Sequence, residues 1–221
     1  ERALVMAERV APAVEAAGRR PLGEEMRAYF ARLAYWFRYR ETWGLALARF
    51  TADGAFYFLA FWIPNYLSDV RGFGLKEIAW AAAIPFVFAD LGSLLGGYSG
   101  QRLIRNGWSV DASRKTMIWI GALFVLLMGL GIFGIQVKSA SLFAVPADIF
   151  PPTAVATVWG ASGAAGSLAA AFSQPVIGWT IDKYSYEPVF VAVALMHIVS
   201  AACIMLLVRR IEPVALKPGM P

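Results

Sequence analysis

Two charged side chains interrupt long apolar stretches of this sequence. Asp90 lies within Phe86-Val87-Phe88-Ala89-Asp90-Leu91-Gly92, and Lys138 is a lone lysine in a similarly apolar setting. Burying a charge in an apolar medium is costly, so each charge is a candidate for a functional site. Two interpretations remain open. Lys138 and Asp90 pair between helices, or Lys138 attracts an anionic substrate while Asp90 has another role.

Polar residues surround Lys138 in the sequence. Gln136, Ser139 and Ser141 could donate hydrogen bonds to a ligand, which a packing residue would not need. In a regular helix, however, Lys138 and Ser141 share one side, while Gln136 and Ser139 share roughly the opposite side. One cavity could therefore receive all four only if the helix were loosened, for example near Pro146.

Other candidate residues have simpler interpretations. Arg49 and Asp53 are four residues apart, so they can form an ion pair on one helix face, and we predict a mainly structural role. Trp159 stands among small residues and is either a stacking surface for a substrate or a ring at the membrane interface. A lone histidine at His197 is expected to hydrogen-bond a neighbouring helix more readily than to carry protons.

Several classes of chemistry lack their residues. The chain has one histidine and one cysteine, Cys203, so we expect no metal site, no disulfide, no cofactor and no catalytic triad. No phosphate-binding loop occurs. The charge of +5 is placed in short segments rather than over a face, which argues against nucleic-acid binding. The sequence therefore does not favour an enzyme.

The elements that must position these residues are transmembrane helices. Apolar residues make up 59% of the chain and charged residues 16%, and the mean hydropathy is +0.58, outside the usual range of soluble domains. A membrane-spanning helix needs roughly 20 apolar residues. Five stretches meet this length: Trp43–Tyr66, Ile78–Ser99, Thr116–Phe143, Ala154–Ile181 and Pro188–Val208.

The distribution of basic residues conflicts with five crossings. Eight of the 20 Lys and Arg precede Trp43, four lie between Arg102 and Lys115, and three follow Val208. Such segments prefer the cytoplasmic side, which requires an even number of crossings. Lys115–Phe150 is too long for one span and too short for two. We expect that sequence has been lost around Gly129–Gly134, and the alternative is one long, tilted helix.

The segment before the first span differs from the rest. Met26–Tyr39 interleaves arginines with aromatic residues, which suits a helix in the headgroup layer, although a solvated linker is equally compatible. Small residues recur at helix-packing spacing within two of the spans. They are Gly92 and Gly96, then Gly160, Ala164 and Leu168, with Gly163 and Gly166 between them.

The run Gly97-Tyr98-Ser99-Gly100-Gln101-Arg102-Leu103-Ile104-Arg105 resembles the cytoplasmic loop signature G-x-x-x-D-R-x-x-R of the major facilitator superfamily. The positions that match are Gly97, Arg102 and Arg105. Gln101 replaces the aspartate, so the charged latch that this loop usually forms is not expected in the same form.

Longer strings resemble the anion:cation symporter family, and most of all its hexuronate and aldonate transporters. They are Arg40-Glu41-Thr42-Trp43-Gly44, Phe61-Trp62-Ile63-Pro64-Asn65-Tyr66-Leu67, Arg71-Gly72-Phe73-Gly74-Leu75-Lys76-Glu77-Ile78, Ala89-Asp90-Leu91-Gly92-Ser93, Val145-Pro146-Ala147-Asp148-Ile149-Phe150-Pro151 and Gln174-Pro175-Val176-Ile177-Gly178-Trp179. The resemblance implies an all-α fold of two six-helix bundles. It makes 1–42 the central linker, 43–208 the C-terminal bundle and 209–221 a cytoplasmic tail, with an N-terminal bundle as partner in the same protein.

The resemblance also implies proton-coupled symport of a sugar acid, a hexuronate or aldonate, by alternating access in the bacterial inner membrane. The site would lie between the two bundles. We expect Lys138 to bind the carboxylate, Asp90 to be its buried electrostatic partner, and the remaining contacts to come from Gln136, Ser139 and Asn65 for hydroxyls and from Tyr57 and Trp159 for the ring. The alternatives are a truncated membrane protein without transport and, less favoured, a membrane-embedded enzyme.

Overall fold

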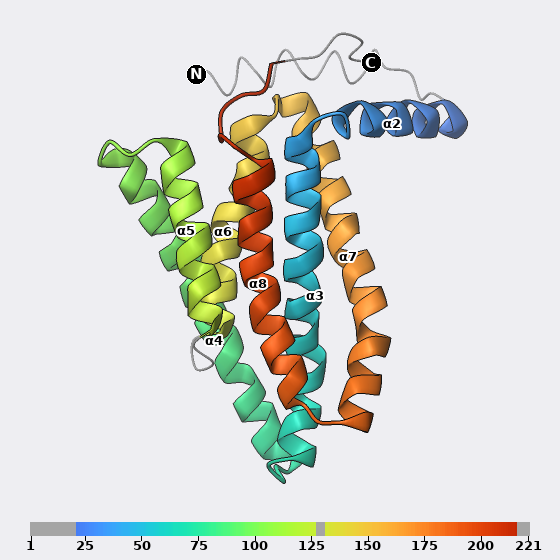
Figure 1. The fold of residues 1–221 in the computed structure, drawn as a ribbon, viewed down its shortest axis with the longest axis vertical. Coiled ribbons are helices and arrows are strands. Elements are labelled where there is room, and N and C mark those ends of the chain that lie inside the picture. Colours follow the sequence, from blue (N-terminus) through green and yellow to red (C-terminus); the bar gives the residue numbers. More distant parts are fainter. Residues whose placement is uncertain (1–20, 127–130, 216–221) are drawn as a thin grey trace.

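The computed structural model describes residues 21–126 and 131–215, and within these ranges every regular element is an α-helix. Figure 1 shows one elongated bundle with a short helix lying across one end. The helices are α2 (Leu22–Trp36), α3 (Arg40–Asp69), α4 (Leu75–Arg105), α5 (Val110–Leu126), α6 (Gly131–Ile149), α7 (Pro152–Lys183) and α8 (Glu187–Leu207).

The all-α membrane bundle is confirmed. The stretches Trp43–Tyr66, Ile78–Ser99 and Ala154–Ile181 lie inside α3, α4 and α7, and α8 matches the last stretch to within one residue at each end. Within the described ranges, α4, α7, α8 and residues Ile132–Ile149 of α6 are long and apolar enough to cross a membrane. The helix α3 has the length but carries several charges, including Arg49 and Asp53.

The prediction of a single crossing over Thr116–Phe143 is wrong, and so is the alternative of one long, tilted helix. This stretch belongs to two helices, α5 and α6, which pack side by side along their length. Hydropathy could not separate them because both helices are apolar and the sequence between them has no charged residue. The bundle 40–208 therefore contains six helices in the described residues, the even number that the basic segments require.

Both helices are short. At about 1.5 Å per residue, the 17 residues of α5 and the 19 of α6 extend for about 25 Å and about 28 Å. The 30 to 32 residues of α3, α4 and α7 extend for about 45–48 Å by the same measure. Such a difference is what a loss of sequence around Gly129–Gly134 would produce. Residues 127–130 lie outside the described residues, and the loss stays a prediction.

The described parts of the three basic segments lie at one end of the bundle. Figure 1 places α2, the turn between α4 and α5, and the segment that follows α8 at the same end. The turns from α3 to α4 and from α7 to α8 lie at the other end. This arrangement is the one expected when cationic segments stay on the cytoplasmic side of a membrane.

An aromatic cluster joins α2 to the bundle at this end. Tyr35 and Trp36 are buried and pack edge-on against each other and close to Tyr39, and Trp36 also contacts Phe150 at the end of α6. The other side of α2 exposes Leu22, Met26 and Phe30. The helix predicted in this segment is therefore present, and its placement in the headgroup layer stays a prediction.

The segment after α8 is anchored to the same end. Lys115 Nζ donates to the carbonyl of Arg209 at 2.6 Å, and Asp111 accepts a hydrogen bond from the backbone of Ile211 at 2.7 Å. Lys115 also pairs with Asp111.

At the opposite end of the bundle, the Tyr186 hydroxyl donates a hydrogen bond to Asp69 at 3.1 Å. Burial together with this bond raises the pKa of the Tyr186 phenol.

Glycines set the close approach of α4 to α6. A Cβ on Gly92 would lie 2.5 Å from the carbonyl oxygen of Phe133, and one on Gly96 would lie 2.8 Å from the Cα of Val137. These small residues serve the packing role that their spacing predicted. On α7 the predicted stripe divides. Gly163 and Gly166 face α3, whereas the remaining three residues (Gly160, Ala164 and Leu168) are exposed.

The exposed surface of α4 is apolar on most sides. Seven large apolar side chains of this helix are each 45–79% exposed: Trp80, Ile84, Phe86, Val87, Phe88, Leu91 and Leu94. Water would not stabilise a helix with apolar residues over so much of its surface, whereas hydrocarbon or another apolar helix would. Lipid or a further helix bundle must therefore cover α4.

Candidate functional site

Lys138 lies in the core of the bundle and not on an open face. Its Nζ is 2.9 Å from Nδ1 of His197 and 3.0 Å from Oγ of Ser200, both on α8. Ser200 in turn donates to the carbonyl of Ala48 on α3 at 2.7 Å. All three side chains are fully or almost fully buried. This network ties α6, α8 and α3 together, and it confirms that His197 hydrogen-bonds a neighbouring helix.

The proton positions follow from the donors available. A protonated Lys138 can only donate, so Nδ1 of His197 must accept, and the imidazole proton then lies on Nε2. Nε2 is buried without a partner, as is the hydroxyl of Ser141 on the same side of α6 as Lys138. The helix α6 runs on through Pro146 to Ile149, so Gln136 and Ser139 point elsewhere.

Asp90 does not pair with Lys138. Asp90 is exposed on α4, and the predicted buried charge is wrong for this position. The rotation of α4 explains the difference, because its closely packed face consists of Ala89, Gly92 and Gly96, and Asp90 lies about 100° from Ala89. The role predicted for Lys138 as the carboxylate ligand stays a prediction, and its burial argues against it.

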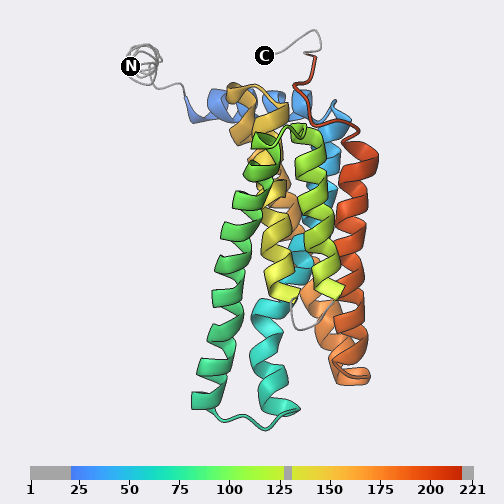
Figure 2. The same ribbon diagram turned by 90° about the vertical axis from the view of Figure 1, so that its left-hand side faces the viewer.

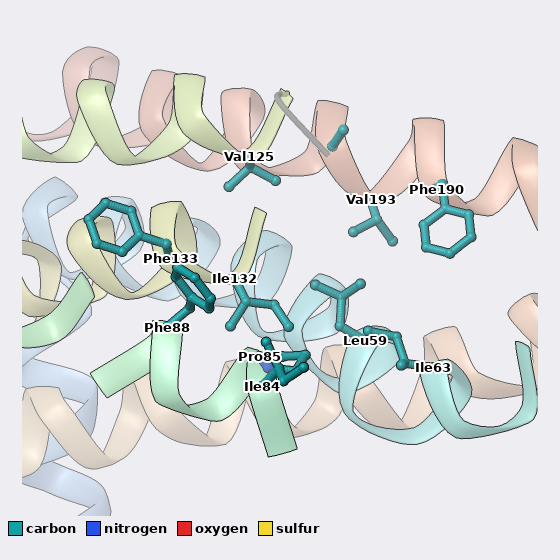
Figure 3. A pocket seen from close by; sticks show the side chains of 11 residues that line it. Leu59, Ile63, Ile84, Pro85, Phe88, Val125, Ile132, Phe133, Phe190 and Val193 are labelled. Carbon is teal, nitrogen blue, oxygen red and sulfur yellow. The ribbon is translucent and has the colours of Figure 1, made fainter. Parts of the chain in front are cut away.

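An apolar cavity of about 250 Å³ lies beyond the ends of α5 and α6. Figure 3 shows the side chains that line it, among them Leu59 and Ile63 on α3, Ile132 at the start of α6, and Val193 on α8. Pro85 on α4 closes another side. The lining has no charged side chain, so the cavity offers packing space and not a polar binding site.

A second pocket of about 150 Å³ adjoins this cavity and contains polar groups. Asp90 on α4 and Gln136 on α6 line it, with Phe56 and Pro64 of α3 on another side. Gln136 and Asp90 therefore line the same pocket, an arrangement that the sequence did not predict. A carboxylate and an amide together can orient the hydroxyls of a polar ligand.

Arg49 and Asp53 form the ion pair that their spacing predicted. Nε and Nη2 of Arg49 both donate to Oδ2 of Asp53, at 3.0 Å and 2.8 Å, and the side chains are 14% and 19% exposed. The guanidinium lies 4.8 Å from the ring centre of Phe143 on α6 and 5.1 Å from that of Trp159 on α7. Trp159 is itself held by a hydrogen bond from Nε1 to the carbonyl of Phe143.

The other predicted ligands are dispersed. Tyr57 is half-buried and stacks on Phe61, Asn65 is exposed near the far end of α3, and Ser139 is half-buried on α6. A hydrogen bond of 2.7 Å from Trp62 Nε1 to Gln174 Oε1 joins α3 to α7, and no sequence pattern predicted it. The amide nitrogen of Gln174 is buried without a partner.

The loop signature is helical here. Gly97, Gln101, Arg102 and Arg105 all belong to the last turns of α4, and the turn itself begins at Asn106. Arg102 donates to the hydroxyl of Tyr98 at 3.2 Å. Close by, Gly100 accepts a hydrogen bond from Ser113 of α5 at 2.7 Å, and Arg114 pairs with Asp148 of α6 at 2.9 Å. These bonds join the adjacent ends of α4, α5 and α6.

Metal chemistry has no support in the described residues, where no group of three or more His, Cys, Asp or Glu lies close enough to hold an ion.

Comparison with known proteins gives the family. The chain is 34% identical to the hexuronate transporter of Escherichia coli over 184 residues, which cover 76% of this chain. It is 42% identical to the galacturonate transporter of Dickeya chrysanthemi over 108 residues and 26% identical to a D-galactonate transporter of E. coli over 192 residues, 47% and 80% of this chain. The chain is a homologue of the sugar-acid transporters of the major facilitator superfamily.

No family model matches the chain. The chain spans about 43%, 30% and 44% of the three relatives, less than half of each. The sequence identities with these three relatives confirm the resemblance to hexuronate and aldonate transporters. Six helices in the described part of this chain agree with one bundle of the sugar-acid transporter fold.

Proposed function

We propose that this chain is one bundle of a secondary active transporter that moves a sugar acid, a hexuronate or aldonate, together with H⁺ across the bacterial inner membrane. The relatives named above are transporters of hexuronate, galacturonate and galactonate. The apolar exterior of the helices and the basic residues at one end of the bundle support the membrane location.

The observation that carries the proposal is the one-sided placement of polar groups. α5 packs on α6 and α8 packs on α3, while α4 and α7 stand on opposite sides of the bundle (Figure 1). The ion pair of Arg49 and Asp53 on α3 lies beside the ring of Trp159 on α7, and Gln136 and Asp90 line a pocket between α3, α4 and α6. An anionic, hydroxylated substrate needs this combination of a cation, hydrogen-bonding groups and ring surfaces.

Alternating access requires a second bundle against which this face can rock. We propose that the second bundle belongs to the same transporter and covers the face between α4 and α7, so that the site lies near the bilayer midplane. Gln136, Tyr57 and Trp159 are the proposed ligands for hydroxyls and for the sugar ring. The apolar exterior of α4 is consistent with such a covering.

Uptake by the whole transporter tests the proposal. Vesicles containing it are given labelled glucuronate, galacturonate or galactonate, with and without an inward pH gradient. We expect accumulation of at least one acid, and faster accumulation when the outside is acidic. If vesicles without the protein retained as much labelled acid, transport would be contradicted. If the rate of accumulation were the same with and without the pH gradient, H⁺ coupling would be contradicted.

A second candidate is a membrane protein that inserts but does not transport. The short α5 and α6 favour it, because a helix of about 25 Å is shorter than a hydrocarbon core of about 30 Å. Under this alternative, the protein is found in the membrane fraction and binds none of the three acids. The same vesicle assay, combined with measurement of membrane insertion, separates the two candidates.

A further inference from the structure

A pocket lined by arginines opens at the basic end of the bundle. Its volume is about 580 Å³, and it lies between the turn from α2 to α3 and the segment that follows α8. Arg38 lies in the turn and Arg40 begins α3, whereas Arg209 and Arg210 belong to the segment after α8. All four side chains are exposed. We call the site formed by these four residues the arginine pocket.

The arginine pocket carries a positive charge that its own lining does not balance. Its four arginines face two glutamates, Glu41 and Glu212, which leaves a net charge of +2. Nε of Arg40 pairs with Glu41 at 3.1 Å. The guanidinium groups of Arg209 and Arg210 enter no ion pair within residues 21–126 and 131–215. An anion that enters the pocket can therefore bind to both of them.

Acidic groups elsewhere at this end of the bundle do not offset this charge. Asp111 pairs with Lys115 at 2.7 Å, and Asp148 pairs with Arg114 at 2.9 Å. The glutamates of α2 lie in its first turn, at the opposite end of that helix from the pocket. The positive charge of the arginine pocket is thus left for a ligand.

The backbone after α8 holds one wall of the pocket in place. The carbonyl of Arg209 accepts a hydrogen bond from Lys115 at 2.6 Å, and the N–H of Val214 donates to the carbonyl of Ile149 at 3.0 Å. Between these two bonds, Ile211 is only 2% exposed. The two arginines are therefore carried by a fixed segment, and a ligand that binds them loses less conformational entropy than one that must order a mobile tail.

The turn from α2 to α3 forms the other wall and adds the positive end of a helix. Tyr39, the residue before α3, is buried, and its side chain does not cap the helix. The first N–H groups of a helix have no partner within it and attract anions. The guanidinium of Arg38 lies 5.8 Å from the ring centre of Tyr35, which is also buried. Both features place positive charge on a wall that the aromatic cluster supports.

The arginine pocket lies at the level where a membrane surface is expected. The helix α2 lies across this end of the bundle (Figure 1) and exposes Leu22, Met26 and Phe30. Trp43 follows Arg40 by three residues, about 4.5 Å along α3, and its ring is 49% exposed while Nε1 donates to a backbone carbonyl. Such rings gather at the level of lipid headgroups. Headgroup phosphates are therefore anions that the pocket can reach.

We propose that the arginine pocket binds the phosphate headgroup of an anionic phospholipid, in the leaflet at the basic end of the bundle. Guanidinium groups bind phosphate oxygens with two parallel hydrogen bonds, and basic pockets between membrane helices hold anionic headgroups. The acyl chains of this lipid extend into the hydrocarbon beside α2 and Trp43. Because the start of α3 and the segment after α8 then share one ligand, the bound lipid joins the first and last helices of the bundle.

The first measurement uses the whole protein in detergent, titrated separately with phosphatidylglycerol, phosphatidylcholine and soluble glycerol 3-phosphate. The melting temperature reports binding, since a ligand that binds the folded state raises it. We expect phosphatidylglycerol to raise the melting temperature at concentrations where the other two do not, and this rise to shrink as salt is added. Equal effects of the two lipids would overturn the inference. An equal effect of glycerol 3-phosphate would assign the pocket to soluble anions and overturn it as well.

Variants locate the bound lipid. Arg209→Gln combined with Arg210→Gln should lower the affinity for phosphatidylglycerol by about tenfold or more, because two charges are lost while the backbone bonds of the segment remain. Arg102→Gln combined with Arg105→Gln is the matched control, since it removes two exposed arginines at the same end, on α4 and outside the pocket. It should leave the affinity nearly unchanged. Equal losses in the two double variants would reduce the effect to general charge attraction and overturn the site.

A crosslinking measurement needs no variant. Phosphatidylglycerol with a photoreactive diazirine on its headgroup is activated by light in vesicles that contain the unaltered protein, and the crosslinked peptides are identified. Crosslinks should gather within 38–41 and 209–215, the two walls of the pocket. Crosslinks confined to other segments, such as 102–115, would overturn the inference.

This inference and the proposed function can fail separately, because the lipid site and the proposed substrate site are on different surfaces. A protein that binds phosphatidylglycerol in the arginine pocket but takes up none of the sugar acids would contradict the proposed function alone. A transporter that accumulates an acid but shows no preference for phosphatidylglycerol would overturn the lipid site alone.

Discussion

Lys138 shows how a buried charge can brace a bundle. Its ammonium joins α6 to α8 through His197 and Ser200, and Ser200 extends the connection to Ala48 of α3. The spacing of Lys138, Gln136 and Ser139 suggested a binding site, but only Gln136 lines a pocket. Residue type and spacing therefore identified unusual positions without deciding which side of α6 faces the substrate.

Replacing Lys138 distinguishes a structural role of this side chain from a role in substrate binding. We expect Lys138→Gln to lower the stability of the detergent-solubilised transporter by about 1–3 kcal/mol, because His197 and Ser200 lose a buried partner. Affinity for the acid should stay unchanged. Thermal unfolding and ligand titration measure the two effects, and Lys76→Gln, at an exposed position, is the control. Loss of affinity with normal thermal stability would instead place Lys138 in the binding site.

At the scale of elements, glycines determine how closely helices approach. Gly92 and Gly96 bring α4 against α6, and Gly166 brings α7 against Asp53 of α3. The repeat spacing predicted close contacts, yet it did not show which helix each glycine faces. On α7 only part of the predicted stripe is used within the described bundle, and Gly160 remains exposed.

Alanine substitutions test the contact between α4 and α6. Gly92→Ala and Gly96→Ala should each lower the melting temperature in detergent, since the added methyl group would lie within 3 Å of the backbone of α6. Gly97→Ala is the matched control, because a Cβ there meets nothing within 4 Å and alanine favours the helix by roughly 0.5–1 kcal/mol. Equal melting temperatures for all three variants would contradict the packing described.

The whole molecule is organised by the membrane. Its basic segments gather at one end, and the chain returns to that end because α5 and α6 are separate helices. The apolar cavity of about 250 Å³ lies where these two helices stop and α3, α4 and α8 continue. Extra turns on α5 and α6 would occupy this space, which agrees with the predicted loss of sequence.

Labelling determines the orientation of the bundle. In a transporter with Cys203→Ser, single cysteines are introduced by Ser68→Cys, near the turn from α3 to α4, and by Ser109→Cys, between α4 and α5. In intact cells a membrane-impermeant maleimide should label the first variant readily and the second only after permeabilisation, because basic segments remain inside. Equal labelling of both in intact cells would contradict a membrane-spanning α4.

The sequence alone determined the medium, most of the helices and the family. Helix formation in lipid depends on local length and hydropathy, so most spans could be located to within a few residues. It also specified the pair of Arg49 and Asp53, since residues four apart on a helix always meet. Only the tertiary structure decided that Lys138 is internal, that Asp90 is exposed, and that Phe143 and Trp159 flank Arg49. These facts depend on how each helix is rotated about its axis, which the packing of neighbouring helices sets and no single segment encodes.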